Sequence, residues 1–265
     1  MMKYIDYVKK DQLAYVFLNR STFNGINYEM AEELGQAWRD FEGDPAMRVC
    51  ILGSRTDNFS AGFDIQQLSE MVEAGEYAWS KSVMFGDIRV GPHDNGVTKP
   101  IIGAYHGIVN ATGLWLAFQA DIILTTPETT FGLGEGLLNF PVEFAGLLSR
   151  YLPRVIANQL LLTARPLPAR RLYEVGAINE ITARKDLLPK AEKMASYICS
   201  CGPGAVSVMK CLADDAMTAG SAAVGKRTGE LVVPVVNSPD TREGIRAFFE
   251  KRKPSWGVSH KETPE

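Results

Sequence analysis

An apolar segment, an amphipathic segment and a second apolar segment follow one another near the start of the chain. Residues 13–18 are short, apolar and partly aromatic, which is typical of a β-strand. Asn27 can cap a helix over residues 27–41, where large apolar side chains recur at helical spacing. Residues 49–52 indicate a second, buried strand. A helix between two strands favours a parallel or mixed sheet, so the sequence predicts an α/β fold.

The alternation continues for about two thirds of the chain and then stops. We expect strands over 101–104, 121–124 and 177–181, and helices over 64–75, 113–119, 141–151, 155–163 and 169–175. From residue 186 onward the pattern indicates helices alone, including one that begins at Ser238-Pro239. The predicted organisation is therefore an α/β core over 1–185 and a C-terminal helical region over 186–265.

Charge and composition exclude several classes of partner. The chain has 28 Lys+Arg against 31 Asp+Glu, a formal net charge of −3, which gives no reason to expect nucleic acid or an anionic membrane. The N-terminus lacks the apolar region of a signal peptide, and we expect the four cysteines to be buried thiols in a reducing compartment. These features predict a cytoplasmic protein.

Several common catalytic motifs are missing from the sequence. It contains no GxxxxGK[ST] phosphate loop and no GxSxG nucleophile motif, and three histidines make a His-rich metal site improbable. We therefore expect no metal, and we expect carboxylates and backbone groups to carry any chemistry.

Two glycine-bearing segments, residues 58–65 and 107–113, each lie between a predicted strand and a predicted helix. Such a junction leaves backbone N–H groups free at the positive end of the helix. Two junctions that face one another could bind a carbonyl oxygen that becomes an enolate. The spacing alone is equally compatible with two tightly packed turns.

The order of these and other short segments resembles the crotonase, or enoyl-CoA hydratase/isomerase, superfamily along nearly the whole chain. No segment is specific by itself, but their order and spacing together are. They are residues 18–20 (LNR), 24–26 (NGI), 41–45 (FEGDP), 59–65 (FSAGFDI), 99–102 (KPII), 106–107 (HG), 121–123 (DII), 131–132 (FG), 243–244 (EG) and 247–252 (AFFEKR).

The resemblance implies a spiral of β-β-α units with a C-terminal helical trimerisation region, and a homotrimer or a dimer of trimers. It implies an acyl-CoA thioester as substrate, with CoA entering as part of the substrate and no other cofactor. Carried over by position, Phe63 and Thr112 would supply the N–H groups that hold the thioester oxygen.

Further residues match positions that reach CoA in the superfamily. They are Ser60, Ala61, Phe63, Asp64 and Ile65 in the first glycine-bearing segment, and Phe248 and Lys251 near the C-terminus. Lys251 also lies in a charged run, where a solvated helix charge is equally expected.

The departures from the superfamily pattern bear on the reaction. Its hydratases use two glutamates, and the first of these positions is Trp115, which cannot transfer a proton at neutral pH. The second position is Glu135, and Glu143 matches a site where some members place another working carboxylate. We expect Trp115 to make the substrate pocket apolar, and His93, in an irregular segment, either to reach the acyl end of that pocket or to be an exposed loop residue.

Proton transfer by Glu135 alone therefore favours isomerisation over hydration. Two alternatives stay open. One is a carbon–carbon (β-diketone) hydrolase of the same fold that acts without CoA, and the other is a non-catalytic binding or scaffold member.

Overall fold

The computed structural model describes residues 2–76, 78–216 and 221–257, which form two compact units. The first unit holds the described residues up to Val97 together with Ile101–Ala195. The second holds Thr98–Pro100 and the described residues from Ser196 onward. The boundary expected at 185/186 falls at the start of helix α7 (Arg184–Ser200), whereas the compact units divide inside this helix.

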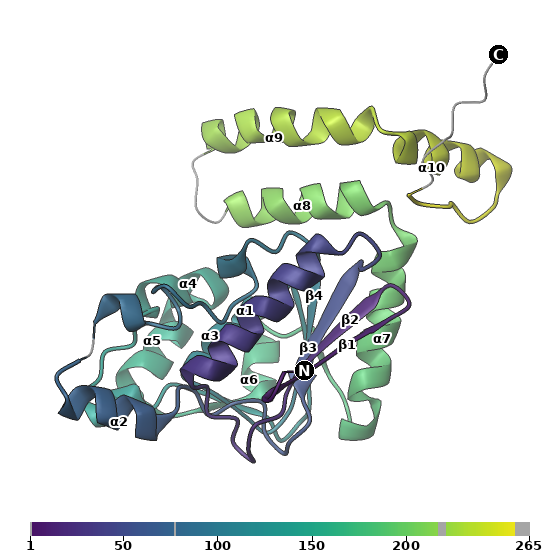
Figure 1. The fold of residues 1–265 in the computed structure, drawn as a ribbon. Helices are drawn as coiled ribbons and strands as arrows, with labels where there is room; N and C mark the ends of the chain where they lie inside the picture. The colour runs from purple at the N-terminus through teal and green to yellow at the C-terminus, as the bar shows by residue number, and fades with distance from the viewer. Residues whose placement is uncertain (1, 77, 217–220, 258–265) are drawn as a thin grey trace. The chain divides into compact units, whose positions relative to one another are not determined.

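A six-stranded mixed sheet forms the centre of the first unit (Figure 1). Its strand order is β1-β2-β3-β4-β6-β9, and only the β1–β2 pair is antiparallel. The parallel register pairs Leu13 with Val49 and Cys50 with Ile101. The strands are β1 (Ile5–Lys10), β2 (Leu13–Leu18), β3 (Val49–Ser54), β4 (Ile101–Tyr105), β6 (Ile122–Thr125) and β9 (Glu180–Ile181). The prediction of an α/β fold with a mixed sheet is confirmed.

Helix α1 (Tyr28–Gly43) forms as its capping residue and apolar spacing predict. The side chain of Asn27 accepts a hydrogen bond from the Met30 amide at 3.0 Å, which satisfies one free N–H of the first turn. Trp38 is fully buried, and its Nε1 donates to the Val90 carbonyl at 2.8 Å. The helix thereby fixes the segment around residue 90 against the core.

A second, three-stranded sheet was not expected from the sequence. It consists of β5 (Ile108–Asn110), β7 (Thr130–Gly132) and β8 (Leu167–Pro168), in the order β5-β7-β8. Strand β5 leads directly into helix α3 (Thr112–Phe118), and an isolated bridge joins Ser60 to Val109. The segment before α2 (Ile65–Glu73) is thereby held beside the start of α3.

The helix expected over 141–151 is wrong. The chain there forms a 3₁₀ turn, η4 (Ala145–Leu147), followed by the short helix α4 (Leu148–Tyr151). The Leu147 amide donates to the Phe144 carbonyl three residues back, and Gly146 lowers helix propensity at the centre. The remaining elements of this unit are η1 (Trp79–Lys81), η2 (His93–Asn95), η3 (Glu135–Leu138), α5 (Arg154–Thr163) and α6 (Ala169–Glu174).

The second unit is helical, with α8 (Pro203–Ala216), α9 (Ser221–Val236) and α10 (Pro239–Glu250) following the end of α7. Ser238 caps α10 by accepting from the Thr241 amide at 3.3 Å. Just past this helix, Arg252 donates to both oxygens of Glu243, at 2.6 and 3.0 Å. In the part of the chain that the structure describes, no helix is both long and apolar enough to cross a bilayer.

The expectation of buried cysteines holds for one position only. Cys50 is buried in β3, Cys201 is exposed, and Cys199 and Cys211 are half-buried. Cys199 lies on α7 and Cys211 on α8, and Cys201 follows α7 directly.

Candidate active site

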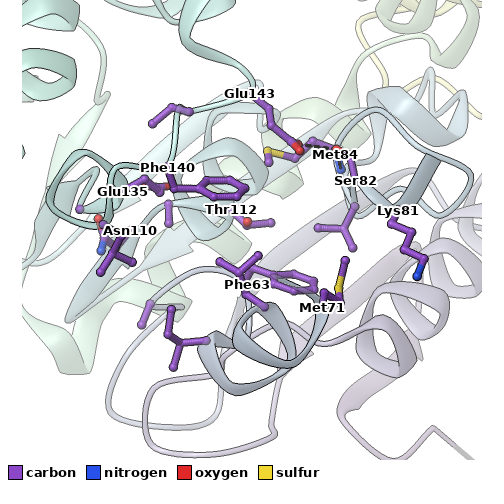
Figure 2. Close-up of a pocket in the computed structure, with 18 of the residues that line it drawn as sticks. Phe63, Met71, Lys81, Ser82, Met84, Asn110, Thr112, Glu135, Phe140 and Glu143 are labelled. Carbon is purple, nitrogen blue, oxygen red and sulfur yellow. Dashed lines mark hydrogen bonds between the residues drawn. The ribbon is translucent and has the colours of Figure 1, made fainter. Parts of the chain in front are cut away.

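A cavity of about 300 Å³ opens in the first unit, between segments that are far apart in the sequence (Figure 2). Its walls come from Tyr28 on α1 and from residues within 61–71, 81–84, 110–112 and 134–143. Most of the lining is apolar, including Met71, Met84 and Phe140. Two carboxyl side chains, Glu135 and Glu143, also line it.

The two glycine-bearing junctions pack against one another at this cavity. Gly62 has φ +112°, and a Cβ built on it would lie 2.3 Å from the Ala111 Cβ and 3.4 Å from the Thr112 nitrogen. No side chain fits in that space, so glycine is required by both the backbone conformation and the contact. The junctions therefore face each other, which was one of the two possibilities left open by their spacing.

Phe63 and Thr112 both line the cavity. Thr112 is the first residue of α3, so its N–H lies outside the helical hydrogen-bond ladder. Within the described residues, neither amide donates to a protein acceptor, whereas the adjoining Asp64 amide donates to the Ile26 carbonyl at 2.8 Å. The pair can thus offer two N–H groups to an oxygen in the cavity.

Asn24 and Ser60 hold the first junction in place. The Asn24 side chain donates to the Asn58 and Phe59 carbonyls, each at 3.0 Å. The Ser60 hydroxyl donates to the Asn24 carbonyl at 2.8 Å and accepts from the Gly62 amide at 3.1 Å. Ser60 is fully buried and does not line the cavity; its side chain supports the loop, and its expected place along the CoA path stays a prediction.

The other residues expected along the CoA path divide into two groups. Ala61, Phe63 and Ile65 line the cavity. Asp64 does not line it; this carboxylate caps α2 and pairs with the Arg20 guanidinium at 2.6 Å. Contact of any of these residues with CoA stays a prediction.

Glu135 begins the 3₁₀ turn η3 and is half-buried. Its Oε2 atom is buried and has no hydrogen-bond partner among the described residues. Burial raises the pKa of the Glu135 carboxyl, while hydrogen bonds from the backbone at Glu135 and Gly134 offset part of that rise. A buried carboxyl with an unpaired oxygen in an apolar cavity is suited to accept or donate a proton.

Glu143 lies on another part of the cavity wall and is held by a partner that sequence reasoning missed. The Ser82 hydroxyl donates to Glu143 Oε2, as the two side chains in Figure 2 show. Ser82 lies 61 residues before Glu143, in an irregular segment, and no motif marks it. The only signal available in the sequence was that a serine can pair with a carboxylate.

Trp115 and His93, both expected in the substrate pocket, are not among the residues that line this cavity. The Trp115 indole is 4% exposed and packs behind the wall against Phe85 and Phe144, with ring centroids 5.4 and 5.2 Å away. Its Nε1 donates to Asp94 at 3.2 Å. The His93 ring lies 4.0 Å from the Asp121 carboxylate, in a half-buried position.

Phe248 and Lys251 belong to the second unit, at the end of α10. Phe248 is 80% exposed, and Lys251 ends the helix in a left-handed conformation with φ 54°. Their expected contact with CoA also stays a prediction.

Comparison with known proteins names the family of this chain. The model of the enoyl-CoA hydratase/isomerase family matches residues 9–259, so the chain belongs to this family. The predicted superfamily and the predicted crotonase-like fold are confirmed.

Similar proteins agree with this assignment. The carnitinyl-CoA dehydratases of Citrobacter koseri and Salmonella enteritidis are each 28% identical over 263 residues, covering 97% of this chain and 99% of theirs. The crystal structure of an enoyl-CoA hydratase from Mycobacterium tuberculosis matches with a TM-score of 0.85 at 28% identity, covering 96% of this chain and 98% of that one. An enoyl-CoA hydratase/isomerase from Mycobacterium paratuberculosis matches with a TM-score of 0.87 at 25% identity, covering 97% and 99%.

Proposed function

We propose that this enzyme isomerises a carbon–carbon double bond in an acyl-CoA thioester by proton transfer through Glu135. One observation carries the proposal: the Glu135 carboxyl, whose Oε2 atom is buried and has no partner among the described residues, shares an apolar cavity with Phe63 and Thr112, whose amides donate to no described acceptor. A base and two oxyanion donors at one cavity are the groups that enolate chemistry needs.

The proposed reaction conserves every atom of the substrate. The thioester oxygen of a 3-enoyl-CoA accepts hydrogen bonds from the Phe63 and Thr112 amides. Glu135 removes a proton from C2, and the electron pair of that bond moves into a dienolate whose negative charge rests on the thioester oxygen. The same carboxyl then returns the proton at C4, and the double bond moves from C3–C4 to C2–C3. The raised pKa of Glu135 makes it a stronger base than an exposed glutamate.

The lining of the cavity supports an apolar acyl chain. Leu68, Met71, Met84 and Val142 surround the space beyond the two amides. The charged end of Lys81 is engaged by Glu76 at 3.1 Å. An acyl group that carries its own charge would lose its hydration against these side chains.

Dehydration is a second candidate, favoured by the presence of Glu143 in the same cavity. Removal of water from a 3-hydroxyacyl thioester needs one group to take the C2 proton and another to protonate the leaving hydroxyl. Two carboxyls could divide these tasks, and similar proteins are named carnitinyl-CoA dehydratases.

The test is to incubate the enzyme with 3-enoyl-, 2-enoyl- and carnitinyl-CoA thioesters and to measure the mass of each product by mass spectrometry. Isomerisation leaves the mass unchanged, whereas hydration and dehydration change it by one water. We expect isomerisation of the 3-enoyl thioester with an apolar chain. We expect Glu135→Gln to lower kcat by about 10²–10⁴-fold because a proton-transfer group is removed. Binding of the thioester should be retained.

The matched control is Glu174→Gln on α6, a carboxylate outside the cavity that pairs with Arg170. Unchanged kcat in Glu135→Gln would remove Glu135 from the mechanism. If wild-type protein binds no CoA thioester, the proposal fails in favour of a CoA-independent β-diketone hydrolase or a non-catalytic member.

A further inference from the structure

The Ser82 hydroxyl has a fixed hydrogen-bond direction. Ser82 is 4% exposed, and its Oγ accepts from the Met84 amide at 3.1 Å and from the Phe85 amide at 3.0 Å. A serine hydroxyl offers two lone pairs and one proton. Because the two amides occupy the lone pairs, the proton is directed to Glu143 Oε2, its third neighbour.

The backbone holds this hydroxyl in place. The Gly86 amide donates to the Ser82 carbonyl at 2.8 Å, and Tyr28 donates its phenolic proton to the Lys81 carbonyl at 2.7 Å. A Cβ on Gly86 would lie 2.2 Å from the Ser80 carbonyl oxygen, so this turn is closely packed. Ser82 is therefore a fixed donor on the cavity wall.

We propose that Ser82 is a positioning residue that fixes the orientation of the Glu143 carboxyl in the cavity by donating to its Oε2 atom. The hydrogen bond also joins the wall segment at 81–84 to the one at 142–143. The inference rests on the second candidate under the proposed function, dehydration, in which Glu143 is the second carboxyl beside Glu135.

The two carboxyls consequently differ in kind. Glu135 Oε2 has no partner among the described residues, whereas Glu143 is oriented by a fixed donor. Burial raises the pKa of Glu135, whereas the hydrogen bond from Ser82 orients the carboxyl of Glu143. A restrained carboxyl transfers a proton to one place on the acyl chain, because its orientation is determined before the substrate binds.

A double-mutant cycle in kcat tests this role, with Ser82→Ala, Glu143→Gln and the double variant on the substrate that wild type turns over. We expect Ser82→Ala to lower kcat about tenfold with KM within about twofold, because it removes orientation and not binding. We expect Ser82→Ala to cause no further loss in the Glu143→Gln background. Ser82→Thr retains a hydroxyl and should restore most of the lost kcat.

Two results would overturn the inference. One is an equal loss from Ser82→Ala in both backgrounds, which is the behaviour of a residue that supports only its own loop. The other is a wild-type kcat in Ser82→Ala. Neither result contradicts the proposed role of Glu135, which is tested separately by the Glu135→Gln variant.

Discussion

At the scale of single residues, Glu135 combines features that rarely occur together without a function. A buried carboxyl normally finds a hydrogen-bond donor or a cation, because an unpaired buried charge is costly. Here burial is the main cause of the raised pKa, and the Oε2 atom has no partner in the described part of the chain. The protein therefore gives up some stability at neutral pH to keep this group available.

This cost predicts a pH-dependent stability difference between wild type and Glu135→Gln. The folded-state pKa is raised above the unfolded value, so the favourable contribution is complete below the unfolded pKa and is lost as pH rises through the folded pKa. Glutamine is neutral throughout. We expect equal melting temperatures near pH 4 and a higher melting temperature for the variant near pH 8, roughly the span over which a raised glutamate titrates. Calorimetric melts at both pH values check this, and a difference that shrinks with rising pH would contradict it.

The sequence could identify part of the site and not the rest. Glu135, Phe63 and Thr112 become candidates through the superfamily resemblance, because each matches a position in one of its short motifs. Ser82 lies in no motif of this kind, and only the fold brings it close to Glu143. Trp115 has the helical spacing of a wall residue, but its ring packs against Phe85 and Phe144 instead.

At the scale of elements, the site depends on the contact between the loop before α2 and the start of α3. The bridges that join Ile26 to Phe63 and Ser60 to Val109 hold that loop between an N-terminal segment and strand β5. The two amides are therefore fixed by backbone contacts from three separate parts of the chain.

Comparing Gly62→Ala with Gly75→Ala distinguishes the steric effect of a Cβ at this contact from the backbone strain that any residue other than glycine has at positive φ. Gly75→Ala is the matched control. Both glycines have positive φ, +112° and +66°, but a Cβ at Gly75 meets nothing within 4 Å. We expect Gly75→Ala to cost about 1 kcal/mol of stability with unchanged kcat. Gly62→Ala should also move Thr112 away from Phe63 and lower kcat by about 10²-fold or more. Assays of kcat and urea unfolding measure both, and equal kcat in the two variants would count against the proposed pair of amides.

Elements with local signals could be predicted, and elements made by long-range pairing could not. Helices α1 and α10 have capping side chains at Asn27 and Ser238. Strands β5 and β7 have three residues each, too short for an alternating pattern, and they exist because they pair with each other. The helix expected over 141–151 is replaced by turns around Gly146, and Phe144 beside them is buried.

At the scale of the whole molecule, helix α10 carries apolar side chains that its own unit leaves exposed. Ile245, Phe248 and Phe249 are 56%, 80% and 78% exposed. Exposed apolar clusters of this kind are typical of surfaces that another chain covers. The superfamily resemblance implies a homotrimer or a dimer of trimers, and we propose that these side chains contribute to that assembly.

Light scattering on wild type and Phe249→Glu tests this proposal. We expect a particle of three or six chains for wild type and a smaller one for the variant, because a charge cannot be buried in an apolar interface without a partner. Glu250→Gln, at the next position of the same helix, is the control and should leave the mass unchanged. A monomeric wild type would contradict the predicted assembly.

The packing of Trp115 also constrains which reactions a single substitution could introduce. Hydratases that this sequence resembles carry a glutamate at that position, where this protein has an indole that donates to the half-buried Asp94 carboxylate. A single change to glutamate would leave the space between Phe85 and Phe144 unfilled and would set two acidic groups against each other. A working pair of glutamates would therefore need compensating changes around position 115 as well, so two-glutamate hydration is more than one substitution away from this chain.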